Sequence, residues 1–221
     1  MKRLAPVLTL LSAAFLAWSP VPARAAATVG LWHMDETSGT TANDSSDENN
    51  DGGLSNITFV TPGSDGTGGA YSFNGTSSKV IVSSSSSLSP GSQTITITLR
   101  VNFTDPTDSV GDYDLLRKGS SGAPYYKVEI LQSGRAFCFF RGSSDRKGLT
   151  VGPSLNDGHW HTITCQKTAS TISGTVDGTT STKTVTIGSI SNSASLVFGG
   201  KASGSDDLDE GEMDEVVITL G

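Results

Sequence analysis

Alternating oxygen-bearing side chains before a glycine form the clearest candidate for a metal site in this sequence. Asp47, Asn49 and Asp51 are separated by single residues, and Gly52 follows them. Carboxylate and amide oxygens are the ligands that Ca²⁺ prefers, and a glycine permits the sharp turn of a loop around the ion. A complete helix-flanked calcium loop would place a bidentate Glu at its twelfth position, where this chain has Thr58. The alternative is an Asn/Asp turn without an ion, because these side chains commonly cap their own backbone.

Side chains that could catalyse hydrolysis are few. The sequence contains no Gly-x-Ser-x-Gly nucleophile elbow, no His-Glu-x-x-His pair and no phosphate-binding loop. His159 and His161 fall on one face of a predicted strand and could supply two metal ligands, but no third ligand is evident. The alternative is a structural element in which Trp160 packs in the core or on the sheet surface.

The first 25 residues have the features of a secretory signal peptide. Lys2 and Arg3 give a basic start, residues 4–18 are an apolar run without acids, and Ala23-Arg24-Ala25 matches an A-x-A cleavage site. The apolar run is shorter than the ~20 residues that a bilayer-spanning helix requires. We therefore expect cleavage after Ala25, a secreted, extracellular product, and no integral membrane segment in the mature chain.

The charge balance argues against nucleic acid as a partner. The chain has 221 residues, with 15 basic and 22 acidic side chains and a formal net charge of −7. The predicted leader contains three of the basic residues and no acid, so the rest of the chain has 12 basic and 22 acidic side chains. Phosphate binding needs a basic surface, which this composition does not favour.

Cys138 and Cys165 are the two cysteines of the chain, too few for a Cys-clustered zinc finger or a disulfide-dense miniprotein. They fall in two predicted strands joined by one long connection, so pairing between adjacent strands is geometrically plausible. In the oxidising compartment that export implies, we expect a disulfide, which would stabilise the fold by about 3 to 4 kcal/mol on the chain-entropy model. The alternative is two buried thiols.

After residue 25 the sequence predicts strands and almost no helix, because Ser and Thr are abundant and charged helix formers are sparse. In residues 94–103 apolar side chains alternate with polar ones, which is typical of a strand with one buried face. The predicted strands cover residues 29–34, 57–60, 70–73, 79–82, 94–103, 112–117, 125–131, 135–141, 159–167, 171–176, 184–187, 194–198 and 213–220. Many strands with short Asp-Gly and Gly-rich connections predict a sandwich or barrel, formed by one domain over residues 26–221.

Seven short segments follow one another in a characteristic order. They are residues 30–36 (GLWHMDE), 44–46 (DSS) leading to 50–52 (NDG), 69–75 (GAYSFNG), 115–119 (LLRKG), 155–161 (LNDGHWH), 176–178 (VDG) and 211–216 (GEMDEV). Each segment is weak alone, but their order and spacing make accidental similarity improbable. Together they resemble the laminin-G-like, concanavalin A-type jelly rolls over essentially the whole chain after the leader.

The resemblance implies an all-β fold: a two-sheet antiparallel jelly-roll sandwich with its first and last strands close together. Many members of the family hold a calcium ion. Asp35, beside the first strand, and Asp214, in the last, are the acids that this closeness would bring to a metal site. Members bind glycans or proteins, and others are glycosidases or lyases, so the fold does not settle the function.

Seven acids crowd into residues 206–215 and include a partial match to the catalytic strand of retaining glucanases that share this jelly roll. Glu212, Asp214 and Glu215 are similar to the Glu-x-Asp-x-x-Glu pattern of those enzymes. Alternation puts Glu212 and Asp214 on one face of a strand and Glu215 on the other. No third acid lines up across the strand, so we predict no catalytic residue in this segment.

Ligand recognition by such a fold needs exposed aromatic, amide and charged side chains. Tyr113, Tyr125 and Tyr126, near Arg117 and Arg141, could stack on a sugar and hydrogen-bond its hydroxyls. The alternative for each tyrosine is ordinary packing within the sandwich. We therefore expect a secreted, non-catalytic module that binds glycan, with calcium as a possible aid. The competing classes are a protein-adhesion or surface structural module and a divergent polysaccharide hydrolase or lyase.

Overall fold

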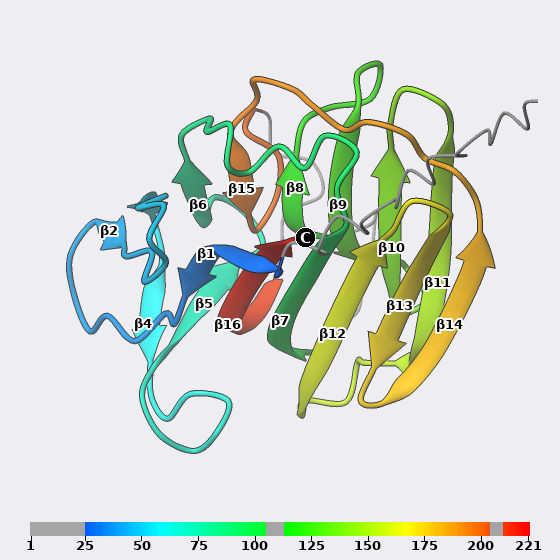
Figure 1. Cartoon of the computed structure of the whole chain (residues 1–221). Coiled ribbons are helices and arrows are strands. Elements are labelled where there is room, and N and C mark those ends of the chain that lie inside the picture. The colour runs from blue at the N-terminus through cyan, green and yellow to red at the C-terminus, as the bar shows by residue number, and fades with distance from the viewer. Residues whose placement is uncertain (1–24, 105–112, 204–209) are drawn as a thin grey trace, which may run out of the picture.

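Two antiparallel sheets stacked face to face make up the structure (Figure 1). The computed structural model describes residues 25–104, 113–203 and 210–221. The predicted signal peptide lies outside these residues except for Ala25, as do Asp112 of a predicted strand and the acids Asp206, Asp207 and Asp209. Within the described ranges, no helix is long and apolar enough to cross a membrane.

Sheet A is the front layer in Figure 1 and sheet B is the layer behind it. In spatial order, sheet A contains β14 (Thr179–Thr184), β13 (Thr171–Val176), β12 (Trp160–Lys167), β7 (Ile95–Phe103), β16 (Glu210–Leu220), β5 (Ala70–Asn74) and β4 (Thr58–Val60), with β1 (Ala27–Trp32) paired to β16. Sheet B contains β11 (Arg146–Ser154), β10 (Arg135–Arg141), β9 (Tyr125–Ile130), β8 (Tyr113–Lys118), β15 (Leu196–Phe198), β6 (Lys79–Val82), β3 (Gly52–Ser55) and β2 (Thr41–Ala42). This architecture confirms the expected two-sheet jelly-roll sandwich.

The core lies between the sheets and is built by alternation along each strand. In β7 every second side chain from Ile95 to Phe103 is buried, as the sequence predicts, and the intervening side chains are partly exposed. The buried residues of both sheets form one hydrophobic cluster. Because the inward faces are fixed by this cluster, the opposite face of each sheet is the surface available to a ligand.

The first and last strands pair directly, as the family resemblance implies. β1 runs antiparallel to β16, with Trp32 opposite Val216. The Trp32 side chain is fully buried, its indole N–H donates to the carbonyl of Asn50, and its ring meets Phe198 edge-on at 5.0 Å. Trp32 is therefore a core residue.

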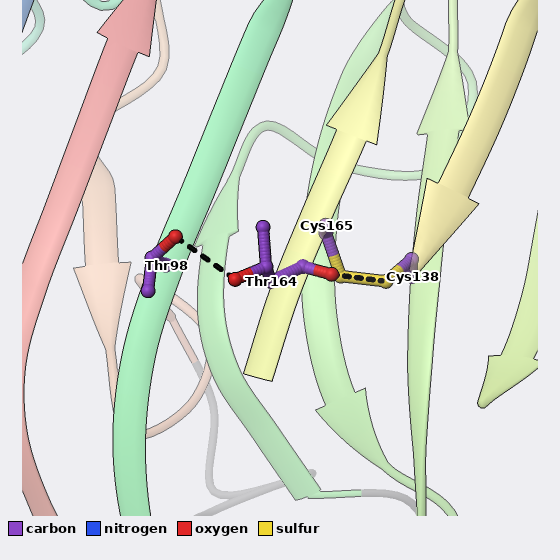
Figure 2. The surroundings of a disulfide bond; sticks show 4 residues. All are labelled: Thr98, Cys138, Thr164 and Cys165. Carbon is purple, nitrogen blue, oxygen red and sulfur yellow. Dashed lines mark hydrogen bonds between the residues drawn. A yellow bond between two sulfur atoms is a disulfide. The ribbon is translucent and has the colours of Figure 1, made fainter. Parts of the chain in front are cut away.

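The predicted disulfide between Cys138 and Cys165 is present, but its strands are not neighbours in one sheet (Figure 2). Cys138 lies on β10 of sheet B and Cys165 on β12 of sheet A, so the bond crosses the core between the sheets. The expectation of adjacent strands is wrong because β11, at the edge of sheet B, separates β10 from β12 and the chain then passes to the other sheet. The bridge therefore fastens one layer to the other.

Several strand positions differ from the prediction. The sequence pattern omits β2, β3 and β11, and it places a strand at residues 184–187 where the structure has β14 at Thr179–Thr184. β11 contains Gly148, Gly152 and Pro153, which interrupt its apolar alternation. β14 contains only Thr, Ser and Lys, so no apolar pattern marks it. The turn at Asp177-Gly178, with φ of 46° and 84°, fixes its pairing with β13.

Candidate functional site

The outer face of strands β8 to β11 in sheet B gathers aromatic and charged side chains. β10 shows how this arises, because its side chains alternate between the core and the outer face. Ala136, Cys138 and Phe140 are fully buried, whereas Arg135, Phe137, Phe139 and Arg141 are exposed or partly exposed. We call the outer face formed by Asp114, Arg117, Tyr125, Lys127, Glu129, Phe137, Phe139 and Arg141 the β8–β11 face.

Three aromatic rings form a row on the β8–β11 face. Tyr125 and Phe139 stack with their centroids 5.0 Å apart, and Phe137 and Phe139 stack at 6.2 Å. Gly148 of β11 makes room for this row, because a side chain at position 148 would collide with the Phe137 ring. Tyr125 is only 7% exposed, whereas Phe137 and Phe139 are partly exposed, so the two phenylalanines are the part of this row that a ligand can touch.

Arg117 is held rigidly at one end of the aromatic row. Its Nη1 donates to Asp114 Oδ2 at 2.8 Å, and its Nε donates to the carbonyl of Gly119 at 2.8 Å. The guanidinium carbon lies 5.0 Å from the centroid of the Tyr125 ring, a cation–π contact. Arg117 is only 8% exposed, so its orientation is fixed before any ligand arrives.

Two carboxylates and a lysine lie next to Arg117 on the same face. Lys127 pairs with Glu129 and lies 3.4 Å from Asp114 Oδ1. Burial disfavours the charged form of Lys127, but the Asp114 and Glu129 carboxylates outweigh burial, so the lysine pKa lies above its usual value. Asp114 Oδ1 is buried and has no hydrogen-bond partner among the described residues. The side chain of Asp114 is 0% exposed, so the charge of this oxygen is balanced by Lys127 Nζ, 3.4 Å away, and the oxygen does not reach the surface of the face.

Two hollows open at opposite sides of the β8–β11 face. One, of about 260 Å³, is lined by Arg117, Gly119, Ser120, Val197, Lys201 and neighbouring small residues. The other, of about 250 Å³, is lined by residues 141–146 where β10 turns into β11, and these include Arg141, Asp145 and Arg146. Cationic side chains thus line both hollows, and the aromatic row lies between them in strand order.

The structure brings together three of the five predicted ligand-binding residues. Arg117 and Tyr125 are in contact, and Arg141 is the cross-strand partner of Tyr125. Tyr126 is fully buried and donates its hydroxyl hydrogen to the Leu88 carbonyl, and Tyr113 packs edge-on against Phe103. These two tyrosines do not belong to the β8–β11 face.

Sequence reasoning missed Phe137, Phe139, Lys127, Glu129 and Asp114. The pattern that could have found them is the alternation in residues 135–141, which sets Arg, Phe, Phe and Arg on one face and Ala, Cys and Phe on the other. Two phenylalanines on the face opposite the core are a sign of a functional surface, because a solvated sheet face usually carries polar residues.

The predicted calcium loop is organised around Asp44. Asp44 Oδ1 accepts hydrogen bonds from Leu31 N and Ser46 N, and its Oδ2 accepts them from Ser46 Oγ and Asn50 N. Among the predicted ligands, Asp51 Oδ1 accepts the backbone N–H of Asp44. The Asn49 amide donates to the carbonyl of Asp47, two residues earlier. These contacts are those of an Asx-type loop that caps its own backbone.

Asp35 and Asp214 both hold the segment 63–69 between β4 and β5. Asp35 Oδ1 accepts the Gly69 N–H at 2.7 Å, and Asp214 Oδ2 accepts the Ser64 N–H at 2.8 Å. Burial raises the Asp214 pKa despite these hydrogen bonds. The two acids therefore accept hydrogen bonds from the same segment, as their positions beside the first and last strands imply.

The five predicted metal ligands do not form one ligand set in this structure. Within residues 25–104, 113–203 and 210–221, no group of three or more His, Cys, Asp or Glu side chains could hold a metal ion. Calcium binding therefore stays a prediction.

His161 lies between two carboxylates. Its Nδ1 is 2.6 Å from Asp177 Oδ2 and its Nε2 is 3.0 Å from Asp157 Oδ1. Burial disfavours the charged imidazolium, but the two carboxylates outweigh it and raise the His161 pKa. His159 is exposed and also approaches Asp157, at 3.3 Å. The contacts of His161 therefore tie the turn before β12 to the turn after β13 and have a structural role.

A β-bulge in β16 separates the three acids that resemble a glucanase strand. The register shifts between Asp214 and Val217, and Glu215 has a φ of 50°. Glu212 accepts a hydrogen bond from the Asn102 amide, Asp214 holds Ser64, and Glu215 pairs with His33 at 2.9 Å. Each acid thus has a separate partner.

Comparison with known proteins agrees with this fold. The model of the family described as the Concanavalin A-like lectin/glucanases superfamily matches residues 74–219, about two thirds of the chain. No curated protein sequence matches the chain.

Solved structures of similar fold include glycan-binding and glycosidase proteins. Domain 4 of AbnA, a GH43 extracellular arabinanase from Geobacillus stearothermophilus solved with arabinotriose, superposes with a TM-score of 0.64 at 15% identity, covering 89% of this chain and 93% of that one. The botulinum neurotoxin serotype D binding domain gives 0.66 at 13% identity, covering 87% and 47%. Trypanosoma rangeli sialidase gives 0.60 at 14% identity, covering 86% and 30%.

At these identities the superpositions show the fold alone, whereas the family match rests on the sequence itself. The family match, together with the paired first and last strands and the two-sheet sandwich, identifies the family. The chain belongs to the concanavalin A-like lectin/glucanase superfamily.

Proposed function

We propose that this chain is a secreted, non-catalytic module that binds glycans on the β8–β11 face. The observation that carries the proposal is the row of stacked rings beside an arginine that is fixed by Asp114 and by Tyr125. Aromatic rings pack against the C–H groups of a sugar, and fixed charged groups hydrogen-bond its hydroxyls. The arabinotriose complex of the similar arabinanase domain supports a glycan as the ligand.

The acids of the β8–β11 face suit binding better than hydrolysis. A glycosidase needs two carboxyl groups that reach the scissile bond, one of them able to donate a proton. The side chains of Asp114 and Glu129 are 0% and 2% exposed, and they are paired with Arg117 and Lys127. Carboxylates that are buried and paired with cations are poorly placed to protonate a leaving group, and they hold Arg117 and Lys127 in position instead.

A glycan array combined with an assay of reducing-end release tests this proposal. We expect binding to one class of polysaccharide and no release of reducing ends from the polymer that binds best. Release that disappears in Glu129→Gln would contradict the non-catalytic assignment and favour a divergent hydrolase. No binding to any glycan, with binding to an extracellular protein instead, would favour adhesion.

Secretion and calcium are part of the same proposal and have separate tests. Intact mass of the exported protein should correspond to a chain that begins at Ala26. If calcium binds at the predicted loop, the melting temperature falls in chelator, and Asp47→Ala removes that difference. The exposed Asp47 side chain makes this a clean variant, because its loss should not disturb the fold. An unchanged melting temperature in chelator would count against a structural ion.

A further inference from the structure

We infer that the ligand of the β8–β11 face is an acidic polysaccharide, one whose sugars carry carboxylate or sulfate groups. This inference rests on the proposed glycan-binding function and names its substrate class. It starts from an uneven distribution of charge between this part of sheet B and the rest of the chain.

Strands β8 to β11 are basic in an acidic protein. Residues 113–154 contain seven basic and three acidic side chains, a net of +4, whereas the other residues contain eight basic and 19 acidic side chains, a net of −11. One of the basic side chains, Lys118, is buried and donates to carbonyls of Asn192 and Ala194, so it is not part of the surface. A local excess of cations that opposes the overall charge favours an anionic ligand at this place.

The cations lie along a line across the strands. The register sets Arg146 of β11 opposite Arg141 of β10, and Arg141 opposite Tyr125 of β9. Tyr125 in turn contacts Arg117 of β8. β11 and β15, the strand that borders the larger hollow, are four strand spacings apart, about 19 Å. This line can follow an extended polymer rather than a single sugar.

Each end of the line has a hollow with two cationic residues in its lining. Arg117 and Lys201 line the hollow on the β15 side, and Arg141 and Arg146, together with Asp145, line the hollow at the turn between β10 and β11. Serine hydroxyls line both hollows as well, at Ser120 and at Ser143. Guanidinium groups pair with carboxylate and sulfate through parallel N–H donors, and hydroxyls add further hydrogen bonds.

The carboxylates within the line favour a glycan over a nucleic acid. Asp114 pairs with Arg117, and Glu129 pairs with Lys127, so part of the positive charge on this face is already balanced. A nucleic acid brings a phosphate with every nucleotide, which Asp114 and Glu129 would repel, whereas a polysaccharide can carry acidic groups on some sugars and leave others neutral. The mixture of cations and carboxylates on this face therefore suits a polymer that has both acidic and neutral sugar units.

Two matched pairs of polymers test the inference. Affinity is measured for polygalacturonate and its fully methyl-esterified form, and for dextran sulfate and dextran, with a single-stranded DNA oligonucleotide as a third polyanion. We expect at least one acidic polymer to bind 10-fold or more tightly than its neutral partner, with an affinity that falls as salt rises. The double substitution Arg141→Gln and Arg146→Gln should remove this preference. Arg100→Gln, on the outer face of sheet A, removes a positive charge away from the β8–β11 face and should keep the preference.

The outcomes separate this inference from the proposed function. Equal binding of acidic and neutral polymers, or binding of neutral glycans alone on the array, overturns the inference and leaves glycan binding standing. DNA binding as tight as that of the best acidic polysaccharide also overturns it, in favour of a general polyanion surface. No binding to any polysaccharide overturns both. The melting temperatures of the variants show whether each has folded.

Discussion

Cys138 and Cys165 join the two sheets through the core, with their Cα atoms 5.5 Å apart. Packed sheets usually lie about 10 Å apart, so the layers are drawn together locally at this bond. Figure 2 shows the bond between β10 and β12, with the Thr98–Thr164 hydrogen bond nearby. The close approach leaves little room for the neighbouring strand.

Gly174 on β13 is the residue that this close approach requires. It lies opposite Cys165, and an added Cβ would collide with Val151 and lie 2.9 Å from Cys138 Sγ. We expect Gly174→Ala to lower the free energy of unfolding by about 1 to 3 kcal/mol, the usual cost of overpacking a core. Gly53→Ala is the control, since its Cβ would approach nothing closer than 3.8 Å. Equal melting temperatures for the two variants would show that the sheets can separate to accept a methyl group.

The two carboxylates around His161 make part of the protein's stability depend on pH. The His161 pKa is raised above 6.5 in the folded protein because the carboxylates of Asp177 and Asp157 outweigh the effect of burial. The contribution of charged His161 to the free energy of unfolding is therefore fully present below pH 6.5 and is lost as the pH rises through the pKa of the folded protein. We expect His161→Gln to be less stable than the parent at pH 5, with a smaller difference at pH 9. Thermal unfolding over this range measures it, and a pH-independent difference would contradict the ion-pair account.

Asp44 is predicted to be the most sensitive acid of the loop that precedes β3. Asp44→Ala would leave the backbone N–H groups of Leu31, Ser46 and Asn50 without their acceptor. Leaving buried donors unsatisfied costs about 1 to 3 kcal/mol for each group, so we expect a loss of at least 2 kcal/mol in the free energy of unfolding. Denaturant unfolding measures this loss. Should Asp44→Ala match the parent in stability, the loop would have an alternative set of hydrogen bonds.

The sequence was enough to predict the sandwich, because a one-sided core leaves a period of two in strands such as β7. It was not enough to assign strands to sheets. In β10 and β12 buried and more exposed positions alternate, and this pattern is the same whether two strands pair in one sheet or face each other across the core. The disulfide was therefore predicted correctly and its geometry was not.

The candidate site was harder to predict than the fold. Tyr125 and Tyr126 are neighbours in sequence, yet one is on the outer face and the other is in the core, and only the register of β9 decides which. Phe137 and Phe139 read as core residues until the inward positions of Ala136, Cys138 and Phe140 are known. A ligand surface on a sheet thus depends on register more than on residue type.

The aromatic row predicts a direct effect on binding. We expect Phe139→Ala to weaken glycan affinity by 10-fold or more, about 1.4 kcal/mol, because Phe139 stacks on both Tyr125 and Phe137. Isothermal titration with the glycan that binds best measures the change. Phe59→Ala is the matched control, since Phe59 is also partly buried and packs edge-on against Tyr71 in sheet A. A similar loss in both variants would point to general destabilisation.

The central claim is that the β8–β11 face is the surface that meets a glycan, and chemical-shift mapping by NMR tests it most directly. The parent protein is titrated with the polysaccharide that binds best. We predict that the largest shifts occur at Arg117, Tyr125 and Phe139. Largest shifts on the outer face of sheet A, where Trp160 and Glu212 flank Asn102, would contradict the account.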